Sequence, residues 1–73
     1  MKRELEKAYG LPVMSLQFIP LSINHFAIEF TTLRGKAYVV PIYKKLANNT
    51  ATLQYRDVTP AEKGIINNYL EKK

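Results

Sequence analysis

The sequence predicts an α+β fold: a small four-stranded antiparallel sheet, a short N-terminal helix, and a C-terminal helix packed on one face of the sheet. The middle of the chain holds segments in which apolar and polar residues alternate, and this is the period of a half-buried strand. Helix signals stand at both ends. The 73 residues fit one domain, residues 1–73, with the N-terminal helix at 1–10, the sheet at 13–56 and the C-terminal helix at 59–72.

The N-terminal helix is predicted over residues 2–9, which are rich in good helix formers. Leu5 and Tyr9 stand at helical spacing, so they belong to one face. Gly10 stands where a helix C-terminus favours a left-handed residue, and Pro12 prevents the helix from continuing.

Two alternating segments follow and predict the first two strands. The first strand, residues 13–19, ends at Pro20, and the second begins after an uncharged connection at residues 21–24. The apolar side chains that share a face within each strand are Met14, Leu16 and Phe18 in the first, and Phe26, Ile28 and Phe30 in the second.

The turn after the second strand decides which face of the third strand, residues 37–43, is buried. A two-residue loop at residues 34–35 places Phe30 opposite Val39, and a three-residue loop at residues 33–35 places Phe30 opposite Tyr38. We favour the longer loop, because Gly35 then occupies the left-handed position that closes a type I turn with a bulge. The large rings then lie under the C-terminal helix and the other face stays open. The open face would carry Ala27, Glu29, Thr31, Ala37, Val39, Pro41, Tyr43, Thr52, Gln54 and Arg56.

Pro41 lacks an N–H group, so we expect an edge strand or a local break near it. Asn48 and Asn49 predict a second hairpin with a two-residue loop, because asparagine tolerates a positive φ. Pairing Ala47 with Thr50 then gives a fourth strand over about residues 50–56, with Tyr55 in the core.

The C-terminal helix has the most complete local signals. Residues 59–62 read Thr-Pro-Ala-Glu, a capping box with proline at the first helical position. Gly64 costs about 1 kcal/mol relative to alanine inside a helix, so we expect it to permit close packing on the sheet. The apolar stripe of this helix consists of Ala61, Ile65, Ile66, Tyr69 and Leu70.

Composition narrows the function. The chain has no cysteine and one histidine, so it offers no thiolate zinc site, and we expect no metal, no cofactor, no small-molecule substrate and no catalytic residue. Residues 8–28 carry no charge, but Pro12, Pro20 and five polar residues within them argue against a membrane-spanning helix. We therefore expect a cytoplasmic protein that is not an enzyme.

The long uncharged stretch favours a protein-binding role, because the centre of a protein interface is depleted of charge. We expect a homodimer, binding to another protein, or both, through the uncharged connection and the open face of the sheet. The predicted partner-binding residues are Ile19, Leu21, Ile23, Val39, Pro41 and Tyr43.

Nucleic-acid binding is the alternative. The formal net charge is +5, a modest basic excess that suits an anionic partner. Stacking on single strands needs several exposed aromatic rings, and the expected open face offers only Tyr43, so phosphate contacts would dominate. The residues predicted for this role are Arg34, Lys36, Lys44, Lys45 and Arg56.

Overall fold

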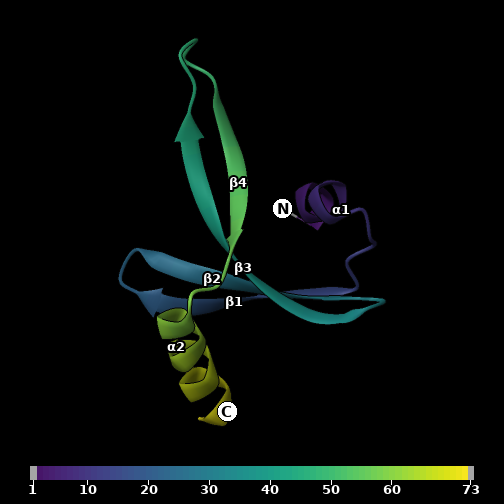
Figure 1. Ribbon diagram of the computed structural model, residues 1–73, viewed down its shortest axis with the longest axis vertical. Coiled ribbons are helices and arrows are strands. Elements are labelled where there is room, and N and C mark those ends of the chain that lie inside the picture. The colour runs from purple at the N-terminus through teal and green to yellow at the C-terminus, as the bar shows by residue number, and fades with distance from the viewer. Residues whose placement is uncertain (1, 73) are drawn as a thin grey trace.

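The computed structural model describes residues 2–72 and confirms the predicted α+β class, with helices at both ends of the chain (Figure 1). Each strand pairs antiparallel with the next, in the order β1-β2-β3-β4. None of the helices within residues 2–72 is long and apolar enough to cross a membrane. The elements are α1 (Lys2–Tyr9), β1 (Ser15–Ser22), β2 (His25–Thr32), β3 (Gly35–Lys45), β4 (Ala51–Asp57) and α2 (Pro60–Glu71).

α1 ends, and α2 begins, at the residues that the sequence predicts. Gly10 closes α1 with φ of 68°, and its N–H donates to the Glu6 carbonyl oxygen at 2.8 Å. Thr59 caps α2, and the capping box with Glu62 is complete. The expectation for Gly64 was wrong, because a Cβ atom built there meets no heavy atom within 4 Å, so nothing packs closely against this glycine.

The turn between β2 and β3 is tighter than predicted. Thr32 pairs with Gly35 and Phe30 pairs with Ala37, so the loop consists of Leu33 and Arg34 alone, and the expected three-residue loop was wrong. The Thr32 hydroxyl stabilises the tight turn: its oxygen accepts from the Arg34 N–H at 3.1 Å, and the hydroxyl donates to the Gly35 carbonyl at 3.3 Å.

The hairpin between β3 and β4 is longer than predicted by one residue. The Leu46 N–H donates to the Thr50 carbonyl oxygen at 2.7 Å, which leaves residues 47–49 in the loop. Asn49, at φ of 59°, supplies the left-handed residue that such a loop requires. A slip of one residue turns a strand over, so the two errors cancel for β4. Tyr55 therefore lies on the Phe30 face as predicted, while Tyr38 lies on the opposite face.

The two helices cover opposite faces of the sheet, which corrects the expected open face. α1 contributes Leu5 to a cluster on one face, and α2 contributes Ile66 to a cluster on the other. The prediction had placed α2 over the Phe30 face, but the register of β3 assigns that face to α1. The first cluster consists of Leu5, Val13, Ile28, Phe30 and Val39. The second consists of Ile19, Ala27, Val40 and Ile66.

Contacts with the sheet and with the segment before β1 hold the short α1 in place. The Leu5 side chain is fully buried. The rings of Tyr9 and Phe30 lie 5.2 Å apart between centroids. The Glu6 carboxylate accepts from the Val13 N–H at 2.8 Å, which ties the helix to the segment that leads into β1. An eight-residue helix thus covers the face of the sheet that carries Phe30.

β3 belongs to two ladders that overlap at a single residue. It pairs with β2 from Gly35 to Val39 and with β4 from Val39 to Lys45. Beyond Val39 the two-stranded ribbon of β3 and β4 leaves the sheet and projects from it (Figure 1), and the molecule measures 43 × 30 × 17 Å. We call residues 41–55 of this ribbon the arm. β3 is continuous through Pro41 at the base of the arm, and its β2 side is unpaired there, so the edge position expected near this proline is confirmed and the local break is not.

Candidate partner-binding arm and groove

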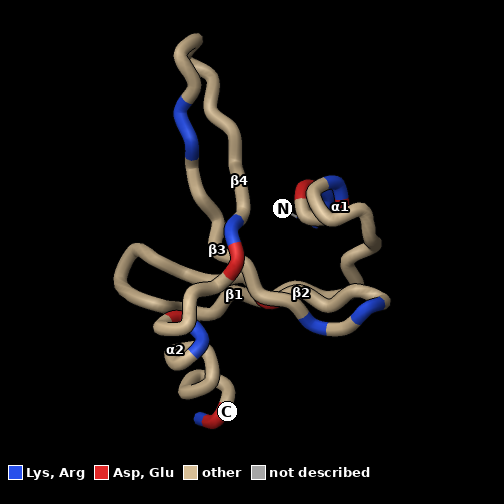
Figure 2. The backbone as a smooth tube through the Cα atoms, viewed as in Figure 1, with Lys and Arg blue, Asp and Glu red and all other residues tan. Residues whose placement is uncertain are grey.

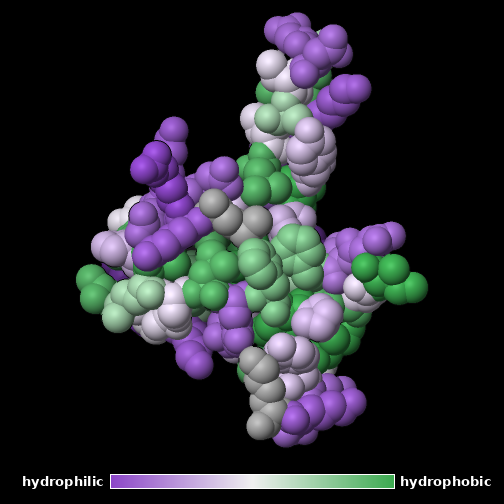
Figure 3. Space-filling view, turned by 180° about the vertical axis from the view of Figure 1, so that it is seen from behind, coloured by the Kyte–Doolittle hydropathy of each residue, from purple (hydrophilic) through white to green (hydrophobic). Residues whose placement is uncertain are grey.

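The arm carries large exposed apolar side chains that no other element within residues 2–72 covers. Figure 3 shows hydrophobic side chains along the projecting ribbon below its polar tip. Tyr43 is 76% exposed and Leu46 is 44% exposed, and both Ile42 and Leu53 are 37% exposed. Adjacent residues of a strand point to opposite faces, so Ile42 and Tyr43 make both faces of the arm apolar. Apolar surface gathered on one projecting element is typical of an interaction site.

The charge of the arm has one sign. Lys44 and Lys45 are its only charged residues, and no acidic residue occurs between Glu29 and Asp57. Figure 2 shows the two lysines on β3 and acidic residues at the root of the arm and on α1. The arm is therefore apolar and weakly basic, while the carboxylates lie near its root.

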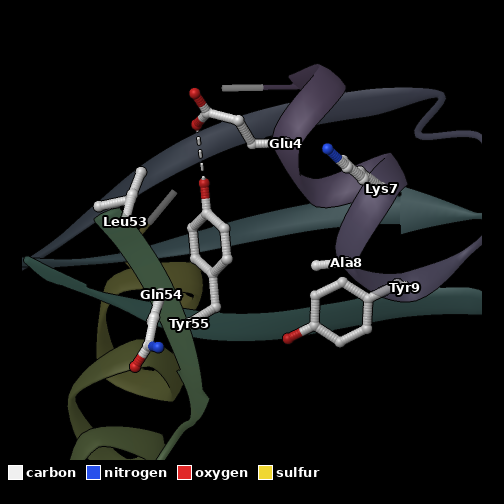
Figure 4. A pocket seen from close by; sticks show the side chains of 7 residues that line it. All are labelled: Glu4, Lys7, Ala8, Tyr9, Leu53, Gln54 and Tyr55. Carbon is white, nitrogen blue, oxygen red and sulfur yellow. Dashed lines mark hydrogen bonds between the residues drawn. The ribbon is translucent and has the colours of Figure 1, made fainter. Parts of the chain in front are cut away.

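A groove of about 580 Å³ runs between α1 and β4 (Figure 4). The Tyr55 hydroxyl spans it and donates to the Glu4 carboxylate at 3.3 Å. Burial, followed by the negative charge of Glu4, raises the pKa of Tyr55 to about 12. Tyr55 and Glu4 thus join the root of the arm to α1. The groove is lined by Glu4, Lys7, Ala8, Tyr9, Leu53, Gln54 and Tyr55.

Arg56, predicted as a phosphate contact, is bound to a carboxylate within the chain. Its guanidinium donates to both carboxylate oxygens of Glu62, at 2.9 and 2.8 Å. The same carboxylate accepts from the Thr59 N–H at 2.8 Å. The hydrogen bonds from Arg56, and next those from Thr59, lower the pKa of Glu62 to about 2. Arg56 therefore joins β4 to the start of α2, and its guanidinium is already paired with Glu62 instead of being available for a phosphate.

A row of polar side chains crosses the sheet on the α2 side. Glu29 is only 6% exposed and stands between Gln17 on β1 and Tyr38 on β3. Its two carboxylate oxygens accept from the Gln17 amide and the Tyr38 hydroxyl, each at 3.0 Å. Burial, then the hydrogen bond and charge of Glu29, raises the pKa of Tyr38. Because both oxygens are engaged, this arrangement satisfies a buried charge. The sequence did not predict this row, because the expected register placed Tyr38 on the other face.

The residues predicted for partner binding do not form one surface. Ile19 and Val39 are buried, at 0% and 1% exposure, because their faces of the sheet are covered by α2 and α1. Leu21 is half-buried against the second cluster. Ile23 is 99% exposed in the turn between β1 and β2. Pro41 and Tyr43 lie on the arm, so they remain candidates, while Ile19 and Val39 do not.

The residues predicted for nucleic-acid binding are also divided. Arg34 and Lys36 lie at the turn between β2 and β3, whereas Lys44 and Lys45 lie on the arm. Figure 2 shows these two basic segments at different extremities of the molecule. Only the lysine pair stands on the surface that also carries the exposed apolar side chains.

Within residues 2–72, no three or more histidine, cysteine or acidic side chains gather closely enough to hold a metal ion. Comparisons with protein-family models, with curated proteins and with solved structures find no match.

Proposed function

We propose that this chain is a non-enzymatic interaction module that binds another protein through the arm. The observation that carries the proposal is the exposure of large apolar side chains on both faces of the arm, with Tyr43 at 76%. Aromatic residues are enriched at protein interfaces, and charged residues are depleted at their centres. Between residues 46 and 55 the arm holds no charge at all.

The instability of a bare ribbon supports the same proposal. A two-stranded hairpin is marginally stable in water by itself, and it gains stability from further strands or a packed face. Tyr55 fixes the root of the arm to α1, but residues 42–54 are exposed throughout. A protein that covers these residues would stabilise the arm as it binds. The homodimer and the cytoplasmic location expected from the sequence remain parts of this proposal.

Affinity capture from nuclease-treated lysate tests the proposal. The variant Tyr43→Ser with Leu46→Ser removes apolar surface from the arm and touches neither buried cluster. The control is Leu33→Ser, because Leu33 is 75% exposed but lies in the turn between β2 and β3. We expect the wild type and the control to capture the same proteins, and the arm variant to capture none of them. Capture that is unchanged by the arm variant contradicts the proposal.

Nucleic-acid binding is a second candidate, favoured by the pair Lys44 and Lys45 on an arm without carboxylates. Lysines that neutralise phosphates release counterions, so the binding affinity would fall steeply with salt. Changing both lysines to glutamine should reduce the slope of log affinity against log salt by about 2, since each lysine bound to a phosphate accounts for about 1. No binding to DNA or RNA at low salt removes this candidate.

A further inference from the structure

The edges of the strands differ in their protection against pairing. The hydrogen bond between Leu46 and Thr50 shows which residue pairs of β3 and β4 are hydrogen-bonded to each other. Bonded and non-bonded pairs alternate in an antiparallel ladder, so even-numbered residues of β4 bond to β3. The odd-numbered residues of β4 direct their N–H and carbonyl groups outward: Ala51, Leu53, Tyr55 and Asp57.

The same alternation, carried across the sheet, locates the two strand prolines. Pro41 directs its nitrogen toward the β2 side of β3, where pairing ends at Val39. Pro20 directs its nitrogen outward from β1, the other edge of the sheet. A proline at such a position interrupts the row of donors and protects an edge against pairing. Residues 51–57 contain no proline, so the β4 edge lacks this protection along its whole length.

We propose that β4 pairs antiparallel with β4 of a second copy of this chain, about a two-fold axis at Gln54. This inference rests on the proposed function, since it names the partner that the arm binds. It also supplies the strand that a two-stranded arm lacks, because the two arms together form a four-stranded sheet.

The sequence of β4 is complementary to itself in this register. Pairing about Gln54 engages all seven residues of β4 and sets every outward-directed residue opposite another. Leu53 meets Tyr55 of the second copy on the face that carries α1. Thr52 meets Arg56, and Ala51 meets Asp57. Like charges directly opposite each other would destabilise the sheet, and this register contains no such pair.

Charge complementarity supports a second copy as the partner. Antiparallel pairing brings the tip of each arm to the root of the other. The tip half carries Lys44 and Lys45 and no acidic residue, whereas the root carries Asp57 and Glu4 beside Lys7 and an Arg56 that is already paired with Glu62. The groove between α1 and β4 lies on the face where the second copy presents its Leu53 and Tyr55 side chains. The pairing thus covers Leu53 and the groove together, whereas Tyr43 lies on β3 and stays outside the paired edges.

A single introduced cysteine tests the register, because the chain has none of its own. In the proposed dimer the two Gln54 residues form a non-hydrogen-bonded pair, whose Cα atoms lie about 4.5 Å apart. This distance permits a disulfide. We expect Gln54→Cys to form a covalent dimer under mild oxidation, seen by non-reducing electrophoresis. The control Asn24→Cys, in the exposed turn between β1 and β2, should form no covalent dimer. A folded Gln54→Cys variant that does not cross-link overturns the proposed register.

Charge substitutions at the same position provide a second test that needs no oxidation. Gln54→Lys or Gln54→Glu places like charges opposite each other at the axis, and each should weaken dimerisation about fivefold or more. An equimolar mixture of the two variants should restore it, as measured by analytical ultracentrifugation. Dimerisation that is unaffected by either substitution contradicts the inference.

The outcome also separates this inference from the proposed function. One outcome is that the wild type is monomeric and the Tyr43 and Leu46 variant no longer captures its partner. A second copy is then not the partner, and another protein binds the arm. If Gln54→Cys cross-links while that variant leaves both capture and dimerisation unchanged, β4 pairing holds and the role of the apolar arm residues is wrong.

Discussion

Replacing Tyr38 with phenylalanine tests the buried polar row. The substitution removes the hydroxyl that donates to Glu29 at 3.0 Å and keeps the ring that packs near α2. Glu29 is 6% exposed, so water does not readily replace the missing donor. A hydrogen bond to a charged group contributes about 1.5–3 kcal/mol, and a buried acceptor left unpaired carries its full desolvation cost. We expect Tyr38→Phe to lower the free energy of unfolding by about 1.5–3 kcal/mol.

This decrease is large for so small a domain. Stabilities of about 0.05–0.15 kcal/mol per residue imply about 4–11 kcal/mol for a chain of 73 residues. Each kcal/mol shifts the melting temperature of a domain of this size by about 4–8 °C. Tyr38→Phe should therefore lower the melting temperature by on the order of 10 °C. Calorimetry and urea denaturation would measure the two quantities independently.

The matched control is Tyr43→Phe, since Tyr43 is 76% exposed and its change should stay within about 0.5 kcal/mol. A double-mutant cycle with Glu29→Gln isolates the energy of the Tyr38–Glu29 pair from the other effects of each substitution. A Tyr38→Phe variant that is no less stable than the control, or a cycle without coupling between the two residues, refutes the stabilising role of this hydrogen bond.

Three further predictions concern the helices and the arm root. The folded pKa of Glu62, about 2, lies below its ordinary value of 4.5. Glu62 therefore stabilises the fold above about pH 4.5, and this contribution is lost as the pH falls toward 2. Urea denaturation should show that the difference in unfolding free energy between wild type and Glu62→Gln disappears over that pH range. A difference that stays constant would count against the bond to Arg56. The pH dependence expected for Tyr55 is the opposite, because its pKa is raised from 10 to about 12. Tyr55 therefore stabilises the fold below pH 10, and this stabilisation is lost as the pH rises to 12. Tyr55→Phe should abolish the corresponding late step in tyrosinate absorbance. Gly64→Ala should raise the free energy of unfolding by about 0.5–1 kcal/mol, because the added Cβ meets nothing within 4 Å. A decrease in stability on urea denaturation would show that the site is crowded.

The sequence predicted the ends of the elements better than their pairing. Gly10 and the capping box at Thr59 act through residues within one helical turn, so their effect is local and was predicted correctly. The two hairpins depend on loop lengths that differ by a single residue, and such a slip reverses every side chain of a strand. The hydroxyl of Thr32, which stabilises the tighter turn, is the feature of the sequence that favours the observed register.

The candidate site was predicted only in part. Pro41 and Tyr43 were among the predicted partner-binding residues and both lie on the arm, but the open face that they were expected to share with Ala27 was wrong. Ile19 and Val39 were assigned to the wrong environment, because apolar residues in a strand look the same whether a helix or solvent lies over them. The ion pair of Arg56 with Glu62 depends on the chain folding back after β4, which no local pattern encodes.

The shared use of β3 by two ladders that overlap at Val39 makes the hairpin energetically separable from the rest of the molecule. The ribbon can fray from its tip without exposing Leu5 or Ile66, so its amide protons should exchange through openings that cost far less than global unfolding. A short peptide epitope inserted between Asn48 and Asn49 should for the same reason be tolerated, which makes the hairpin a replaceable appendage on a scaffold that folds by other contacts.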